Sequence, residues 1–301
     1  MTTFKWLASL VLATTMVSAL TAETSCPGNV ASLPFRLVNH HQMIVAVSVN
    51  HAGPYNFLLD TGMQITLIDP SLAAELHLQP RGTAVVAGAG SSQSASYVAV
   101  DLLEAGSHAV PNQNVLLYEM QNLQGVDLHI RGILGEDFLE HFDMLVDNVH
   151  NLLCLDETAA MRTGVKGAHI ALASANPEQD SASSGLPIIS VHLSDATRPV
   201  RLLLDSGTNG AILYNTPEYL DPPRKGYLPG VGVDGKQRMF PALPPQDVKI
   251  GSLKLTGVQF VSLGRNQTDA RAKGFDGVLT FGLFRRVFIS PADHFAILEP
   301  R

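Results

Sequence analysis

The sequence Asn-Phe-Leu-Leu-Asp-Thr-Gly at residues 56–62 decides the fold, because a second copy stands at residues 201–207 as Arg-Leu-Leu-Leu-Asp-Ser-Gly. Each copy joins an apolar run, typical of a buried strand, to an aspartate, a hydroxyl residue and a glycine. Aspartate and glycine are favoured in turns, so each copy predicts a strand that ends by presenting an aspartate.

A second pair of segments repeats at the same distance from the first. Gly-Ile-Leu-Gly at residues 132–135 is matched by Gly-Val-Leu-Thr at residues 277–280. In each half the branched residue of this segment, Ile133 or Val278, follows the aspartate by 73 residues. Equal spacing of two motifs is improbable by chance, so we interpret the chain as an internal duplication.

The composition is that of a globular protein with a large core. The 301-residue chain is 46% hydrophobic and 16% charged. Short apolar and β-branched runs alternate with Gly, Pro, Asn and Asp, which predicts a mainly β protein with few short helices. We expect strands that include residues 43–49, 97–103, 115–118, 188–193 and 258–263, and helices at residues 71–78, 137–142 and 283–287.

The duplication sets the domain boundaries. We expect a first lobe at residues 23–157, called the first half below, and a second lobe at residues 158–301, called the second half. A polar stretch at residues 174–185 is typical of a loop near the start of the second half.

The N-terminus indicates the compartment. Residues 6–22 are an almost uninterrupted apolar run behind Lys5, and the run ends in small residues before Glu23. This pattern predicts a signal peptide at residues 1–22, cleaved after Ala22, and a periplasmic or secreted protein without stable membrane insertion. The alternative is an uncleaved membrane anchor, although spanning a bilayer requires about 20 apolar residues.

Charge and cysteine content exclude several function classes. A net charge of −7 disfavours nucleic-acid binding, which requires a concentrated basic surface. Two cysteines are too few for a disulfide-built scaffold or a cysteine zinc site. In an oxidising compartment Cys26 and Cys154 could form a disulfide, and the alternative is two unpaired thiols with Cys154 buried.

An apolar strand ending in Asp-Thr-Gly, followed by Ile-Leu-Gly and a short helix, resembles one lobe of an aspartic protease. Residues 35–155 resemble the bacterial retropepsin-like aspartyl proteases, and two such lobes in one chain resemble the pepsin-like arrangement. The matching segments are residues 57–62, 86–90, 132–142 and 145–147. The resemblance implies a mainly β, bilobal aspartic-protease fold of the double-ψ β-barrel type.

The resemblance also implies a catalytic pair, Asp60 and Asp205, one from each half. Two carboxyl groups held close together cannot both ionise cheaply, so the pair keeps one proton over an acidic range. The ionised member can take a proton from water while the protonated member donates to the scissile carbonyl oxygen. We therefore expect a monomeric aspartic endopeptidase that acts on a peptide or protein substrate and needs no metal or cofactor.

Other residues are expected to support this pair. Thr61 and Ser206, if they follow the family, bond across the interface and lock the two aspartate loops together. Gly62 and Gly207 let backbone amides approach the carboxylates. Thr208 conforms to the family pattern after the second motif. The substrate-covering flap is expected at Gly88, Ala89 and Gly90.

Two residues depart from the family pattern. Met63 is bulky where the family has Ala, Ser or Thr, and Thr280 stands where the second lobe should have glycine, so we expect it to crowd or reshape the second catalytic loop. The second flap region, residues 227–240, also differs from the first. These departures leave open a non-catalytic peptide-binding module that retains the protease fold, and an assembly in which two first lobes pair between chains.

Overall fold

The computed structural model describes residues 25–38, 41–88, 91–120, 129–173, 185–214, 226–231, 237–263 and 274–301. Strands predominate, and the mainly β fold predicted from the sequence is confirmed. The helical elements among the described residues are α1 (Pro70–Glu75), α2 (Glu136–Leu139) and the 3-10 turns η1 (Pro27–Asn29), η3 (Ala160–Thr163) and η7 (Phe281–Leu283). None of the described helices is long and apolar enough to cross a membrane. The predicted signal peptide lies outside the described residues.

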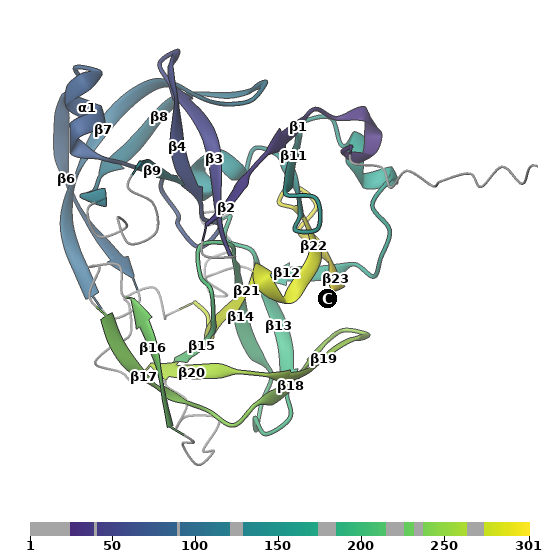
Figure 1. Ribbon diagram of the computed structural model, residues 1–301. Coiled ribbons are helices and arrows are strands. Elements are labelled where there is room, and N and C mark those ends of the chain that lie inside the picture. The colour runs from purple at the N-terminus through teal and green to yellow at the C-terminus, as the bar shows by residue number, and fades with distance from the viewer. Residues whose placement is uncertain are drawn as a thin grey trace, which may run out of the picture.

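The first half forms an eight-stranded sheet, coloured purple to blue in the upper part of Figure 1. Its strands, in spatial order, are β2 (Arg36–Val38), β3 (Gln42–Val49), β4 (Ala52–Leu59), β9 (Ile130–Leu134), β5 (Leu67–Ile68), β8 (His108–Leu117), β7 (Ser91–Ala105) and β6 (Pro80–Gly88). β3 also pairs with β7, which folds the sheet back on itself.

A fifteen-stranded sheet contains the described strands of the second half together with the first strand and the last two strands of the first half. Its strands, in spatial order, are β1 (Ser32–Pro34), β11 (Leu152–Asp156), β10 (Asp143–Asp147), β22 (Phe284–Ser290), β23 (Phe295–Pro300), β12 (Ile170–Ala173), β13 (Ile188–Leu193), β14 (Val200–Asp205), β21 (Gly277–Thr280), β15 (Ala211–Tyr214), β20 (Phe260–Leu263), β17 (Gln237–Ala242) and β16 (Gly226–Val231). β18 (Gln246–Ile250) pairs with β13 and with β19 (Leu253–Val258).

The strand registers repeat between the halves. In the first half β4 runs parallel to β9 with Leu58 opposite Ile133, and in the second β14 runs parallel to β21 with Leu203 opposite Val278. The strand that follows each aspartate loop, β5 or β15, then pairs antiparallel to β9 or β21. Equivalent residues are 145 apart, the separation of Thr61 and Ser206. These registers support the duplication, and the lobe boundaries themselves stay a prediction.

The halves are joined through β10 and β22, which pair antiparallel as neighbours in the larger sheet. Asp147 on β10 stands opposite Arg286 on β22, whose Nε donates to Asp147 Oδ2 over 2.7 Å. Burial opposes ionisation of Asp147, but hydrogen bonds from His150 and Arg286 hold the pKa of this carboxyl below its usual value. The contact therefore contributes to the junction an ion pair between a buried carboxylate and an exposed guanidinium.

Two predicted elements differ from the structure. Residues 283–287, predicted as a helix, belong mostly to β22, where Val287 lies opposite Val146 of β10 and Leu298 of β23. Pairing on both sides overrides the local pattern. The strand predicted at residues 258–263 breaks at Gln259, whose Nε2 donates to the carbonyl oxygens of Leu243 and Phe260.

The two cysteines form a disulfide, which settles the alternatives left open by the sequence. It links the segment before η1 to β11 and closes a separation of 128 residues. Both sulfurs lie in a small apolar cluster with Leu145, Met161 and Phe288. The bond thus fixes the N-terminal segment to the strands that join the halves.

Replacing both Cys26 and Cys154 with serine is expected to lower the free energy of unfolding by about 2–5 kcal/mol, because the unfolded chain regains the freedom of a long loop. Urea denaturation of residues 23–301 measures this. Wild-type protein unfolded in the presence of a thiol reductant is the control and should show the same loss. Equal stability of variant and wild type under oxidising conditions would contradict the expectation.

Candidate active site

Asp60 and Asp205 stand at the ends of β4 and β14, and each of these strands runs parallel to a neighbour, β9 or β21. Asp60 follows the last residue of β4, and its amide donates to the carbonyl oxygen of Leu134 over 3.0 Å. Asp205 is the last residue of β14 and lies opposite Thr280 of β21. Both side chains are half-buried. The repeated motif therefore presents one carboxyl from each half.

Four buried hydrogen bonds tie the two loops together. The amide of Thr61 donates to Ser206 Oγ over 3.0 Å, and the amide of Ser206 donates to Thr61 Oγ1 over 3.1 Å. The hydroxyls then donate across the junction, Thr61 to the Leu204 carbonyl (2.8 Å) and Ser206 to the Leu59 carbonyl (2.9 Å). Thr61 is 0% exposed and Ser206 is 1% exposed. Each loop is thus held by the hydroxyl of the other.

The glycines that follow bring the carboxyl groups close. The amide of Gly62 donates to Asp60 Oδ1 over 2.8 Å, and that of Gly207 donates to Asp205 Oδ1 over 2.7 Å. A Cβ on Gly62 would lie 2.7 Å from Asp205 Oδ2, and a Cβ on Gly207 would overlap the Asp60 carboxyl. Only glycine leaves room for the opposite aspartate at these positions.

The two carboxyl groups act on each other. The Asp205 side chain is hydrogen-bonded to Asp60, which requires that one of the two carboxyls carry a proton. Burial, and then the charge of Asp60, raise the pKa of Asp205 well above its usual range, against the opposing hydrogen bonds from the Gly207 and Thr208 amides. The pair therefore titrates as a unit.

Met63 does not intrude on the pair. Its side chain is buried in an apolar cluster of the first half with Leu58, Leu67 and Ile133, and its amide donates to the Asp60 carbonyl over 3.1 Å. The Met63 side chain is therefore accommodated in the interior of the first half.

The first aspartate loop is braced from behind by two residues that the sequence analysis missed. Asp137 Oδ1 accepts from the amide of Thr66 over 2.9 Å and from its hydroxyl over 2.7 Å. The same hydroxyl accepts from the Gly135 amide over 3.0 Å. The acidic start of the predicted helix at residues 137–142 was the available signal, since carboxylates favour helix N-termini.

Of the two expectations for Thr280, crowding or reshaping of the second loop, the first is not met, because the side chain fits there with two hydrogen bonds. Its side chain is buried, and Oγ1 donates to the carbonyl oxygen of Thr208 over 2.7 Å. The hydroxyl also accepts from the amide of Gly282 over 3.2 Å. The Thr208 hydroxyl makes longer contacts with Gly210.

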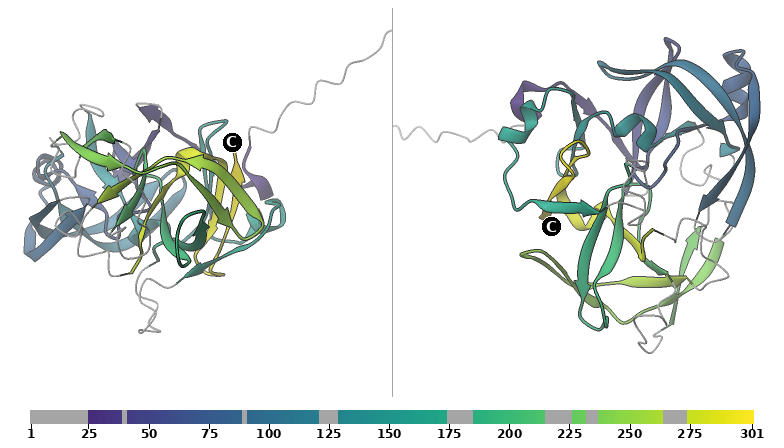
Figure 2. Two further views of the ribbon diagram at one scale, coloured as in Figure 1. Left: turned by 90° about the horizontal axis from the view of Figure 1, so that it is seen from below. Right: turned by 180° about the vertical axis from the view of Figure 1, so that it is seen from behind.

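The predicted flap is the hairpin of β6 and β7, in which Gly88 lies opposite Ser91. Ala89 and Gly90 lie outside the described residues. The equivalent hairpin of the second half, β16 and β17, lies on the same side of the molecule (Figures 1 and 2). It carries exposed apolar side chains, Tyr227 and Met239.

A third carboxyl lies near the pair. Glu136, at the start of α2, is 4% exposed. Burial, and then the charges of Glu140, Asp137 and Asp60, raise its pKa well above the usual value. The sequence analysis did not single out this residue, because its burial depends on packing between distant segments.

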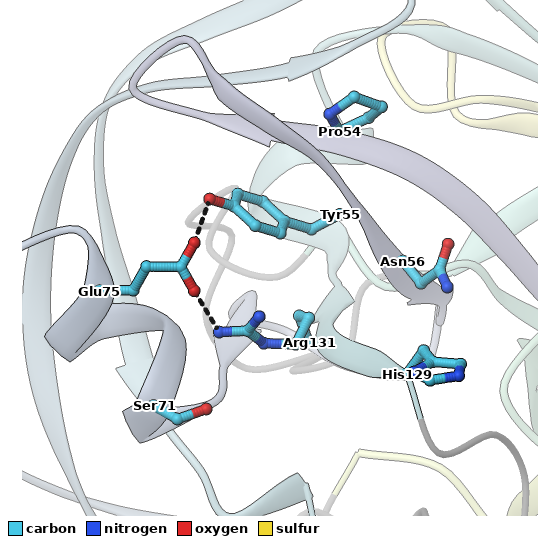
Figure 3. Close-up of a pocket in the computed structure, with 7 residues that line it drawn as sticks. All are labelled: Pro54, Tyr55, Asn56, Ser71, Glu75, His129 and Arg131. Atoms are coloured by element: carbon cyan, nitrogen blue, oxygen red, sulfur yellow. Dashed lines mark hydrogen bonds and ion pairs between the residues drawn. The ribbon is translucent and has the colours of Figure 1, made fainter.

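An open pocket of about 570 Å³ lies at the other end of β4, away from Asp60 (Figure 3). At its centre the Tyr55 hydroxyl donates to Glu75 Oε1 over 3.0 Å, and Arg131 Nη2 donates to Glu75 Oε2 over 2.9 Å. Arg131 also lies over the Tyr55 ring, 5.5 Å from its centroid. These contacts hold α1 against β4 and β9, which gives the cluster a structural role.

The described residues contain no cluster of His, Cys, Asp or Glu that could hold a metal ion. A protein-family model described as aspartyl protease matches residues 45–138. The matched segment contains Asp60, Thr61 and Gly62 together with β9 and most of α2. A search of curated proteins finds no match. Residues 45–138 are thus similar to an aspartyl-protease domain, which supports a protease function in general terms.

Replacing Ser206 with alanine is expected to lower the free energy of unfolding by about 1–3 kcal/mol, because the Thr61 amide and the Leu59 carbonyl lose a buried partner. Urea denaturation checks this. Ser206→Thr is the matched control, since it keeps the hydroxyl. Unchanged stability of the alanine variant would show that the cross-loop bonds are not stabilising.

Replacing Glu136 with glutamine is expected to change how stability depends on pH. The neutral carboxyl contributes stability that is fully present below its ordinary pKa of 4.5 and is lost as pH rises through its raised pKa. Glutamine cannot ionise, so the Tm of Glu136→Gln relative to wild type should rise between about pH 4 and pH 8. Exposed Glu119→Gln is the control and should show a flat difference. A flat difference for Glu136→Gln as well would contradict the prediction.

Proposed function

We propose that this protein is an aspartic endopeptidase in which Asp60 and Asp205 act together on peptide bonds. The observation that carries the proposal is the hydrogen-bonded carboxyl pair held between the reciprocal bonds of Thr61 and Ser206. The aspartyl-protease match over residues 45–138 supports the same class of reaction for the first half.

The pair performs general acid–base catalysis. With one proton shared, the ionised carboxyl takes a proton from a water molecule bound between the two groups. The protonated carboxyl donates its proton to the carbonyl oxygen of the scissile bond as water attacks its carbon. The tetrahedral intermediate then collapses with proton transfer to the leaving nitrogen, which restores the shared proton. Acid and base roles belong to the pair as a whole.

Five residues beside the two aspartates hold the pair in position: Thr61, Gly62, Ser206, Gly207 and Thr208. The Gly62 and Gly207 amides each fix one carboxylate oxygen, and the hydroxyls of Thr61 and Ser206 fix the distance between the loops. Such prior positioning removes the need to reorganise the site in the transition state.

The substrate is an extended peptide bound beneath the hairpin of β6 and β7, with strand-like backbone pairing and side-chain pockets. The residues of this flap that we propose for substrate binding are Gly88, Ala89 and Gly90. Residues 23–157 and 158–301 act as tandem lobes of one monomer. The protein is exported by a signal peptide at residues 1–22 and works in the periplasm or outside the cell.

Both Asp60→Asn and Asp205→Asn are expected to reduce cleavage of a diverse peptide mixture by at least about 10²–10⁴-fold, because each removes a proton-transfer group. The assay uses residues 23–301 between about pH 3 and pH 7, and a shared proton predicts an optimum on the acid side. Exposed Asp101→Asn is the control and should retain wild-type activity.

The same assay separates the alternatives. Loss of cleavage in Asp60→Asn alone would favour a pairing of first lobes between chains, with the second half as a scaffold. No cleavage by the wild type, together with measurable binding of the peptides, would favour a non-catalytic peptide-binding module.

A further inference from the structure

The second aspartate loop is held by a side chain that has no equivalent in the first half. The 145-residue offset places Thr280 at the position of Gly135. Thr280 is the last residue of β21, and Gly135 directly follows the last residue of β9; each of these strands runs parallel to a strand that leads to an aspartate. The two halves therefore carry different residues, glycine and threonine, at the same position of the duplicated site.

In the first half the backbone braces the loop. The amide of Glu136 donates to the carbonyl oxygen of Met63 over 2.7 Å, at the first residue after Asp-Thr-Gly. A Cβ on Gly135 would lie 2.8 Å from this same oxygen, so a side chain at position 135 has no room. The brace is therefore a main-chain donor at the start of α2.

In the second half the equivalent oxygen belongs to Thr208, and it accepts from Thr280 Oγ1 over 2.7 Å. The chain turns here into η7, a 3-10 turn, and Thr280 caps that turn by accepting from the Gly282 amide over 3.2 Å. The Thr280 hydroxyl thus has one donor and one acceptor partner, and Thr280 is 6% exposed. One buried hydroxyl does what a main-chain amide does in the first half.

The peptide unit that Thr280 holds adjoins the catalytic carboxyl. The amide of Gly207 donates to Asp205 Oδ1 over 2.7 Å, and Thr208 is the next residue in the chain. A hydrogen bond at the Thr208 carbonyl therefore fixes the residue that directly follows the one in contact with the reacting group. The connection runs from Thr280 through Thr208 and its neighbour Gly207 to Asp205.

We propose that Thr280 is a positioning residue for Asp205, and that its hydroxyl replaces the main-chain brace used by the first half. This inference rests on the proposed protease function for its catalytic consequence alone. The effect of Thr280 on the second aspartate loop is measured separately, by hydrogen exchange of backbone amides.

The test compares Thr280→Val, which keeps the shape and removes the hydroxyl, with Thr280→Ser, which keeps the hydroxyl. For Val we expect kcat to fall about ten- to hundred-fold with KM nearly unchanged, the size of effect caused by a small misplacement of a catalytic group. Ser should restore most of the rate. Thr163→Val is the matched control, because Thr163 is exposed at the end of η3 and makes a similar hydroxyl-to-carbonyl bond, to Ala160.

Hydrogen exchange of the backbone amides tests the geometry without any assay of cleavage. In Thr280→Val the amides of Gly207 and Thr208 should exchange about ten-fold faster, the effect expected from losing about one hydrogen bond. The amides of Gly62 and Glu136 in the first half serve as the internal reference and should be unchanged. Equal acceleration in both halves would indicate general destabilisation and overturn the proposal.

The two readouts separate the possible failures. Unchanged exchange at Gly207 and Thr208 in the Val variant overturns the positioning role, whatever the activity. If these amides exchange faster in Thr280→Val but the wild-type protein cleaves no peptide, the positioning role stands and the proposed protease function is rejected. Faster exchange with full activity in the Val variant rejects Thr280 as a residue that matters for catalysis.

Discussion

Two carboxyl groups cannot be held in hydrogen-bond contact unless the rest of the protein opposes their repulsion. Burial raises that repulsion, because fewer water molecules screen the charges of Asp60 and Asp205. The reciprocal hydrogen bonds of Thr61 and Ser206 oppose this repulsion, because they hold the two loops together from opposite sides. The parallel strand pairs and the sheet between the halves all serve to keep these two loops in register.

The two halves reach the same loop geometry with different chemistry. Behind Asp60 lies a carboxyl-rich brace built from Thr66, Asp137 and the start of α2, with buried Glu136 beside it. Behind Asp205 lies a neutral brace built from Thr280 and η7. The symmetry of the backbone thus coexists with an asymmetric electrostatic environment. A duplicated site can diverge in this way once each half needs only to preserve the position of its own aspartate.

The sequence predicted those features that depend on local pattern. The two motifs and their equal spacing were enough to place Asp60 and Asp205 at strand ends, and the sites of α1 and α2 followed from short helix signals. The strand β22 was missed because its two neighbours, β10 and β23, decide its conformation. The hydrogen bonds of Thr280 could not be predicted, because they depend on the turn that follows it. Glu136 and Thr66 were overlooked because their importance arises from burial between segments distant in sequence.

The larger sheet places β1 beside β11 and carries the final strand, β23, between β22 and β12. Strands from both ends of the chain therefore share one sheet, and the disulfide fastens the N-terminal segment to it. A polypeptide synthesised from its N-terminus cannot complete this sheet until β23 has left the ribosome. A chain that lacks β23 leaves β22 and β12 without the strand that lies between them, so the sheet that carries Asp205 is closed late in synthesis.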